Sequence, residues 1–208
     1  VYFGRPRLPT SMGKVLFETL KEIGIQVSHR LCSRWLAKKR SGATDPMVEE
    51  VVRIYDDVVS ISAVIAPATI LHSSLICLNY CDRKGNVTGI ATMYGNLGFT
   101  AHLLSFARLE RSLLKHAMIM AVEEVQPATW STLHMVSVIS MISSMTEFNE
   151  GRLRGAIDHG SKARDVCRKM FCPDIVTWGT ATLFTSMAHV FLTNFDISLS
   201  LSNELIRM

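Results

Sequence analysis

Evenly spaced cysteines, the mark of a disulfide framework, are missing from this sequence. Its five cysteines form an odd, scattered set at positions 32, 77, 81, 167 and 172. Small secreted domains that depend on disulfides carry a paired, closely spaced set instead. The beginning of the sequence also lacks the basic and apolar regions of a signal peptide. We therefore expect reduced thiols and a cytoplasmic protein.

Motifs that bind nucleotides or activate a nucleophile are also missing. A P-loop needs a glycine-rich turn whose amides hold phosphates. Residues 12–15 (Met-Gly-Lys-Val) lack both its upstream glycine and the serine or threonine after the lysine. No Gly-x-Ser-x-Gly elbow is present, and the neighbouring carboxylates Glu123 and Glu124 point about 100° apart on a helix. We expect no catalytic residue and no cofactor in this segment.

Candidate metal ligands are few. Cys77 and Cys81 lie one helical turn apart, with His72 five residues before Cys77. Two ligands on one helix face could begin a zinc site. The alternative is that the cysteines are small apolar fillers of a core. Because Cys77 falls at a packing position of the repeat described below, we expect no metal.

Charged residues are sparse, at 19% of 208 residues, and hydrophobic residues make up 48%. Most helices of such a chain should be buried on more than one face. Much of the basic charge lies in residues 1–40, which hold nine lysines and arginines against Glu18 and Glu22. Such a cluster can bind phosphates, nucleic acid or a membrane surface. Because aromatic residues do not alternate with the basic ones, we expect a solvated face and no nucleic-acid partner.

What the sequence does contain is a regular series of helix breakers. Gly85, Pro127 and Pro173 lie 42 and 46 residues apart, and no segment alternates as a strand does. Each block has the apolar spacing of two helices, which is typical of a helical repeat array. The sequence predicts four pairs, at residues 47–64 and 67–82, 87–104 and 106–125, 128–146 and 150–169, and 175–192 and 195 to the end. Turns within the pairs are expected near Ala66, Ser105, Glu150 and Asn194.

A further helix is expected before the array. Apolar residues recur every three or four positions over residues 10–39, as in an amphipathic helix. The dipeptide Asp45-Pro46 then provides a favourable helix start. We predict a basic amphipathic helix and linker at residues 1–45 and a repeat array at residues 46–208. Since residues 203–208 read as the middle of a helix, we also expect a longer parent protein.

Small residues recur where paired helices must cross. A close crossing requires small side chains between the two backbones. Cys77, Ala117 and Ala163 lie 40 and 46 residues apart in second helices, and Ile206 follows 43 residues later. We expect eight positions to pack the repeats: Cys77, Gly98, Ala117, Ser144, Gly151, Ala156, Gly160 and Ala163.

The third pair resembles a tetratricopeptide repeat, in which a turn glycine precedes two alanines seven positions apart. Gly151, Ala156 and Ala163 fit this pattern, and residues 94–98 (Tyr-Gly-Asn-Leu-Gly) resemble its first-helix signature. Glu110 and Leu199 depart from it at positions where small residues are expected, and the repeats are longer than the usual 34 residues. The resemblance implies an all-α, right-handed α-solenoid of about four TPR-like helical hairpins.

The order of motifs also resembles the C-terminal region of bacterial multidomain signalling ATPases. The motifs are residues 4–9, 53–57 and 74–79. In that family a class III adenylate/guanylate cyclase or a protein kinase precedes an AAA/STAND ATPase and a long tetratricopeptide-like tail. The resemblance implies a regulatory segment that catalyses nothing itself. It would bind a protein or peptide partner, or the upstream domains of its own chain.

Two other classes stay open. Residues 58–81, 126–146 and 175–195 contain no charged residue and are long enough to span a bilayer. Because two of these stretches run through expected turns, a membrane is not favoured as a partner. The second alternative is an all-helical regulatory domain of a transcription factor, against which the regular spacing of 40 to 46 residues argues.

Overall fold

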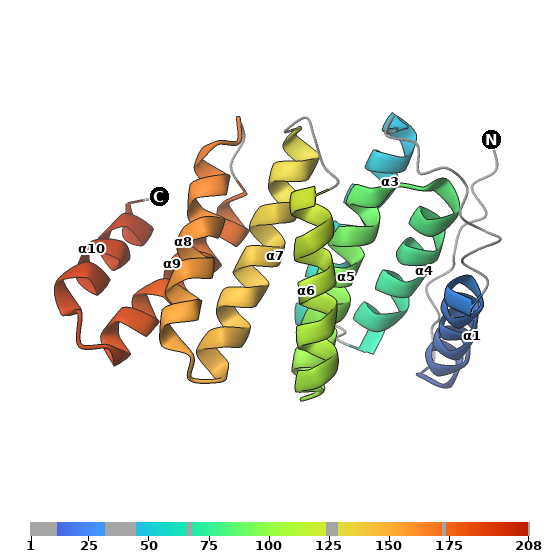
Figure 1. Ribbon diagram of the computed structural model, residues 1–208, viewed down its shortest axis with the longest axis horizontal. Helices are drawn as coiled ribbons and strands as arrows, with labels where there is room; N and C mark the ends of the chain where they lie inside the picture. Colours follow the sequence, from blue (N-terminus) through green and yellow to red (C-terminus); the bar gives the residue numbers. More distant parts are fainter. Residues whose placement is uncertain (1–11, 32–44, 66–67, 124–128, 172–173, 208) are drawn as a thin grey trace. The chain divides into compact units, whose positions relative to one another are not determined.

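The described part of the chain, seen in a computed structural model, is all-α (Figure 1). It comprises residues 12–31, 45–65, 68–123, 129–171 and 174–207, and within these residues there are helices and turns but no strand. The part of the expected first helix beyond residue 31 lies outside the described residues. The helices are α1 (Met12–Leu31), α3 (Pro46–Ile65), α4 (Ala68–Lys84), α5 (Val87–Leu103), α6 (Ala107–Glu123), α7 (Trp130–Asn149), α8 (Leu153–Arg168), α9 (Ile175–Phe191) and α10 (Phe195–Ile206).

The eight helices predicted for the array are present, as α3 and α4, α5 and α6, α7 and α8, and α9 and α10. Three of the four expected turns are confirmed too, and the one near Ala66 lies outside the described residues. Each of the three contains a residue with positive φ, namely Ser105, Gly151 or Thr193. The next amide bonds back five residues, as in the 2.8 Å bond from Arg152 N–H to the Glu147 carbonyl. This is the Schellman ending of a helix, and it lets the partner helix begin almost at once.

First helices begin at side-chain caps, which for α7 and α9 come just after the predicted breakers. The Asp174 carboxylate accepts from the amides of Val176 and Thr177 at 3.0 and 3.2 Å, at the start of α9. Thr129 caps α7 in the same way. Asp45 accepts from the Met47 amide at 3.0 Å, just ahead of Pro46 in the first turn of α3. These bonds satisfy amides that have no partner inside the helix.

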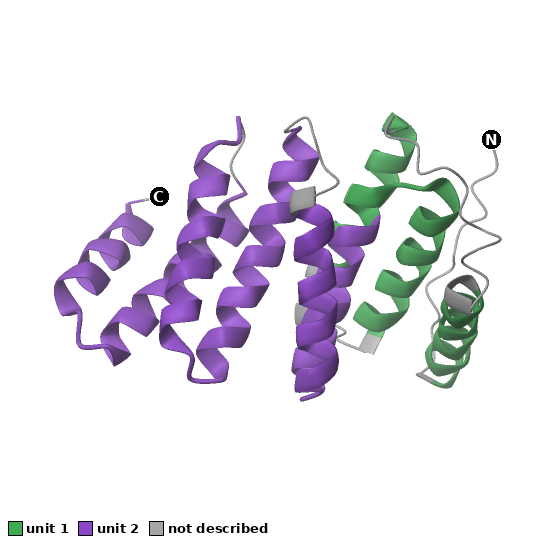
Figure 2. Cartoon of the chain, viewed as in Figure 1, with its two compact units in different colours: residues 1–89 green, residues 90–208 purple. Residues whose placement is uncertain are grey.

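The chain divides into two compact units, shown in Figure 2. Unit 1 is Val1–Gly89 and includes α1, α3 and α4, and unit 2 is Ile90–Met208 and includes most of α5 and all of α6 to α10. In unit 1, α4 packs against both α3 and α1. In unit 2, α7 packs against α6, α8 and α9, and α9 packs against α10.

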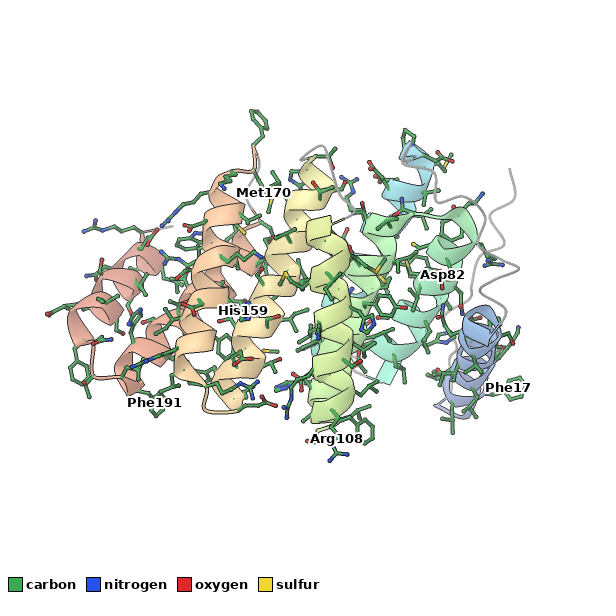
Figure 3. The ribbon with its side chains drawn as sticks, in the orientation of Figure 1. Phe17, Asp82, Arg108, His159, Met170 and Phe191 are labelled. Atoms are coloured by element: carbon green, nitrogen blue, oxygen red, sulfur yellow. The ribbon has the colours of Figure 1, made fainter. Side chains whose placement is uncertain are left out.

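The seam between α1 and α4 is polar. The Gln26 side-chain amide donates to Asn79 Oδ1 and to Asp82 Oδ2, both at 2.7 Å, and Asn79 donates to the Glu22 carboxylate at 2.6 Å. Most of the apolar stripe of α1 faces solvent instead, with Leu16 62% and Leu20 59% exposed. Figure 3 shows Phe17 projecting away from the helix. Helix α1 is therefore oriented by hydrogen bonds and not by its most apolar face.

In unit 2 the same crossing contact occurs in two successive pairs. Ser144 Oγ in α7 donates to the Ala156 carbonyl of α8 at 2.7 Å, and Ser186 Oγ in α9 donates to the Ser198 carbonyl of α10 at 3.2 Å. In the second pair the donor and the acceptor each lie 42 positions further along the chain, at 186 and 198 in place of 144 and 156. The same shift aligns Ala163 with position 205. The sequence spacing had aligned it with Ile206, which is 80% exposed.

Two of the three uncharged stretches, residues 126–146 and 175–195, lie mainly in first helices α7 and α9, while residues 58–81 run from α3 into α4. Helix α7 buries six serine and threonine residues, four of them in its second half, and α9 buries several threonines. Three of these hydroxyl groups bond to the carbonyl four residues earlier: Ser143 to Ile139 at 2.9 Å, Thr182 to Trp178 at 2.8 Å and Thr185 to Ala181 at 2.7 Å. Small hydroxyl residues can thus be buried without distant partners.

Candidate functional site

A groove of about 300 Å³ lies on unit 2 between second helices α6 and α8, with α7 between them. We call it the α6–α8 groove. Residues on one face of α6, spaced three to four apart, form one wall, and α8 contributes a single residue to the opposite side. The groove is lined by Arg111, Leu114, Lys115, Met118, Ile119, Ser143, Thr146, Glu147 and His159.

The base of the groove is apolar. Leu114 is buried, Met118 is half-buried, and Ile119 is 41% exposed. On the α7 side, the Ser143 hydroxyl is already bonded within its own helix at 2.9 Å. Small side chains at this part of α7 leave the space that longer ones would fill. An apolar group entering the groove would therefore meet mainly carbon and sulfur atoms.

The rim of the groove is basic. Arg111 and Lys115 are exposed on α6. From α8, Lys162 places its Nζ 3.6 Å from the sulfur of Met118. Arg111 is 3.4 Å from the Glu150 carboxylate, in a pair whose arginine side is 58% exposed. An exposed ion pair of this kind contributes little stability, so the cations can turn to a different anion.

The carboxylate in the lining is already neutralised. Glu147 accepts two hydrogen bonds from the Arg152 guanidinium, at 2.5 and 2.8 Å, and these bonds lower the pKa of Glu147. Gly155 leaves room for it, since a Cβ atom there would stand 2.6 Å from a Glu147 oxygen. His159, labelled in Figure 3, is half-buried, and burial lowers its pKa. At neutral pH the groove is thus basic, with a neutral imidazole at its α8 side.

A buried polar cluster lies beside the groove. The carboxylate of Glu110, only 2% exposed, accepts a hydrogen bond from the Thr146 hydroxyl and lies 3.0 Å from His102 Nδ1. The other ring nitrogen of His102 is 2.8 Å from the Asn149 side-chain amide. Each member is thereby engaged by another, and the cluster fixes the turn between α5 and α6 against α7. This arrangement suits a structural clamp better than a reacting acid–base pair.

Sequence reasoning noticed Glu110 only as an unexpected residue. It occupies a position where the repeat pattern predicts a small side chain. This mismatch was the signal in the sequence that Glu110 has a special role. The structure accommodates it because His102 and Thr146 supply its partners. The groove was not predicted, because none of the eight expected packing residues lines it.

Most of the expected packing residues are buried within their own unit. In unit 2, Ala117, Ser144, Ala156 and Ala163 are fully buried. Gly98 packs on the Leu114 side chain and Gly160 on Ser144. The structure thus brings Ser144, Ala156 and Gly160 together at the crossing of α7 and α8, and places Gly151 at the turn with φ 76°.

The cysteine pair considered as a metal site lies in the core of unit 1. Cys77 and Cys81 are both fully buried, with their sulfur atoms 3.9 Å apart. The hydrogen bond with Cys81 and burial raise the pKa of Cys77. A raised pKa disfavours the thiolate that metals bind. Among the described residues, no group of three or more His, Cys, Asp or Glu side chains could hold a metal ion.

Comparison of the chain with protein-family models, with curated proteins and with solved structures gives no match. The resemblance to signalling-ATPase tails therefore stays a prediction from the sequence. Within the helices that the structure describes, none combines the length and apolarity that a membrane span requires.

Proposed function

We propose that this chain is a regulatory, protein-interaction segment in which stacked helical hairpins hold a partner. The observation that carries the proposal is the α6–α8 groove, an open apolar cleft with a basic rim on a framework of repeated helix pairs. Repeat arrays offer extended surfaces whose shape is set by neighbouring pairs. Among the described residues no metal cluster competes with this interpretation.

In the proposed arrangement the hairpins form a right-handed, TPR-like solenoid at the end of a larger ATP-dependent signalling protein. A peptide or a domain of the same chain docks on the array and is held in one position. If docking is stronger in one state of the upstream domains than in another, it shifts their activity by the difference in binding free energy. The identity of those domains, a cyclase or a kinase beside an ATPase, rests on the sequence resemblance.

A site-specific crosslinking experiment tests this function. A photoreactive amino acid replaces Ile119 in the groove of the full-length protein, and in a matched control it replaces Arg154, an exposed residue of α8 that does not line the groove. We expect one defined adduct, to a partner or to an upstream segment, from the groove position only. Deleting α5 to α10 should also change the upstream activity. The same adducts from both positions, together with unchanged upstream activity, would count decisively against the proposal.

A further inference from the structure

We infer that the α6–α8 groove binds an acidic peptide segment that inserts one apolar side chain between α6 and α8. This inference rests on the proposed function and names the chemistry of the partner. Its basis is the combination of an apolar base, cations on both flanking helices and a neutralised carboxylate.

The size of the groove limits what can enter. A volume of about 300 Å³ is at the lower end of the range for small-ligand sites. It suits one or two side chains and not a folded domain. The rest of the segment must then lie along the rim. The groove is walled by helices, whose amides and carbonyls are bonded internally, so recognition depends on side chains.

The apolar base favours an aliphatic or aromatic anchor without selecting a single one. Leu114 and Ile119 provide fixed branched surfaces, while Met118 is unbranched and can adapt. The Met118 sulfur also lies against Lys162 Nζ at 3.6 Å. An anchor that displaces this ammonium group would free it to meet a carboxylate of the same segment.

The charges favour an acidic segment over a basic one. Arg111, Lys115 and Lys162 surround the base, and the only carboxylate in the lining belongs to Glu147, which Arg152 already engages. Because the Arg111 side chain is 58% exposed in its 3.4 Å pair with Glu150, Arg111 can exchange this partner at little cost.

The same lining argues against two other polyanions. Single-stranded nucleic acid binds through aromatic side chains that stack on its bases, and no Phe, Tyr or Trp is among the described residues that line the groove. A lipid headgroup would use the cations but leave the apolar base beneath it uncovered. A peptide with both carboxylates and an apolar side chain satisfies both features.

Fluorescence anisotropy with designed peptides tests the inference on the full chain. The probe is a fluorescein-labelled peptide with a central leucine between runs of aspartate and glutamate. Two matched probes carry lysine in place of the acids or serine in place of the leucine. We expect a Kd on the order of tens of micromolar for the acidic leucine probe, and at least about tenfold weaker binding for each of the others.

Charge-reversal variants locate the site. We expect Arg111→Glu combined with Lys115→Glu to weaken binding of the acidic probe by at least about tenfold, and Arg154→Glu, on α8 outside the groove, to change it less than about twofold. Thermal melts by circular dichroism check that all variants stay folded. Equal effects of the two sets, or equal binding of the three probes, would overturn the inference.

Two further arms separate this inference from the proposed function. Groove-dependent binding of oligouridine or of phosphatidylserine vesicles, without binding of the acidic probe, would overturn the peptide assignment. A defined crosslink from position 119 to a segment that is not acidic would leave the proposed function standing and remove the inference. Two results together would support both the inference and the proposed function. The acidic probe would bind and lose its binding in the variant with Arg111→Glu and Lys115→Glu, and position 119 would crosslink to an acidic segment.

Discussion

Two glycines that are alike in the sequence have different structural roles. Gly160 in α8 lies against α7 and α9, where a Cβ atom would clash with the Thr185 hydroxyl and stand 3.2 Å from the Ala181 carbonyl oxygen. Gly179 in α9 has nothing within 4 Å of the corresponding point. Close packing therefore requires glycine at the first position, whereas at the second it only weakens a helix.

We predict that Gly160→Ala lowers the free energy of unfolding by about 1–3 kcal/mol, because a backbone carbonyl cannot move aside as a flexible side chain can. The matched variant Gly179→Ala should raise it by about 0.5–1 kcal/mol, since alanine favours the helix. Urea denaturation followed by circular dichroism measures both. Changes of the same sign in the two variants would contradict this description of the packing of α8.

Two of the helix-ending turns carry a side chain where the backbone favours glycine. Ser105 and Thr193 have φ of 59° and 62°, while Gly85 and Gly151 occupy the same place in two other turns. A β-branched residue is strained in this region. The turn before α10 is therefore held in place by its surroundings and not by the preference of Thr193.

Replacing Thr193 with glycine should raise the free energy of unfolding by about 0.5–1 kcal/mol, because the strain is removed. Gly151→Ala should lower it by about 1 kcal/mol for the opposite reason. Thermal melting of the two variants tests this. A loss of stability in Thr193→Gly would mean that the 2.6 Å bond from the Thr193 hydroxyl to the Leu192 carbonyl outweighs the strain.

Helix pairs are the level at which the sequence is most informative. The predicted starts of α3 to α10 and the predicted ends of α3 to α9 lie within three residues of the observed ones. They were predictable because breakers, caps and apolar spacing are local signals. The orientation of α1 was not predictable in this way. The clearest pattern in the sequence of α1 is its apolar stripe, yet the face that packs on α4 carries Gln26. The hydrogen-bond partners of Gln26 lie more than fifty positions away in the sequence, so no local pattern indicates them.

Because α1 packs on α4 through a polar seam, replacing a glutamine of α1 should cost more stability than replacing a leucine, which is the reverse of the usual order. Gln26→Ala should lower the free energy of unfolding by about 1–3 kcal/mol, because it removes the donor to buried Asn79 and to Asp82. Leu20→Ser, on the exposed stripe, should change it by less than about 0.5 kcal/mol. Urea denaturation compares the two. A larger loss for Leu20→Ser would show that the apolar face is the packed one.

At the scale of the whole molecule, the all-α class was predictable and the candidate site was not. The lining of the α6–α8 groove comes from three helices, and its existence depends on how far apart α6 and α8 stand across α7. That separation follows from long-range packing, such as the Glu110 cluster between α6 and α7. In the repeat pattern, Glu110 is only a residue that does not fit. Local periodicity carries no signal for it.

Buried ionisable groups make the stability of the molecule depend on pH. Burial lowers the pKa of His72, His159 and His189. A histidine with a lower pKa in the folded state binds fewer protons when folded, so stability falls as the pH falls through the unfolded value of about 6.5. Glu147 acts at lower pH. Its bond from Arg152 lowers its pKa, so its contribution is present above about pH 4.3 and is lost as the pH falls through the folded value.

We therefore predict that the free energy of unfolding falls between about pH 7.5 and pH 5.5, by up to about 1.4 kcal/mol per pH unit for each histidine involved. His72 is the sharpest test, because it is buried and its Nδ1 has no hydrogen-bond partner. Burial opposes its protonation, and the carboxylates of Glu22 and Glu18 offset this only in part. His72→Gln should flatten the fall relative to the unsubstituted protein. Urea denaturation across this range at constant ionic strength decides the matter, since equal slopes for the two proteins would mean that buried His72 does not resist protonation.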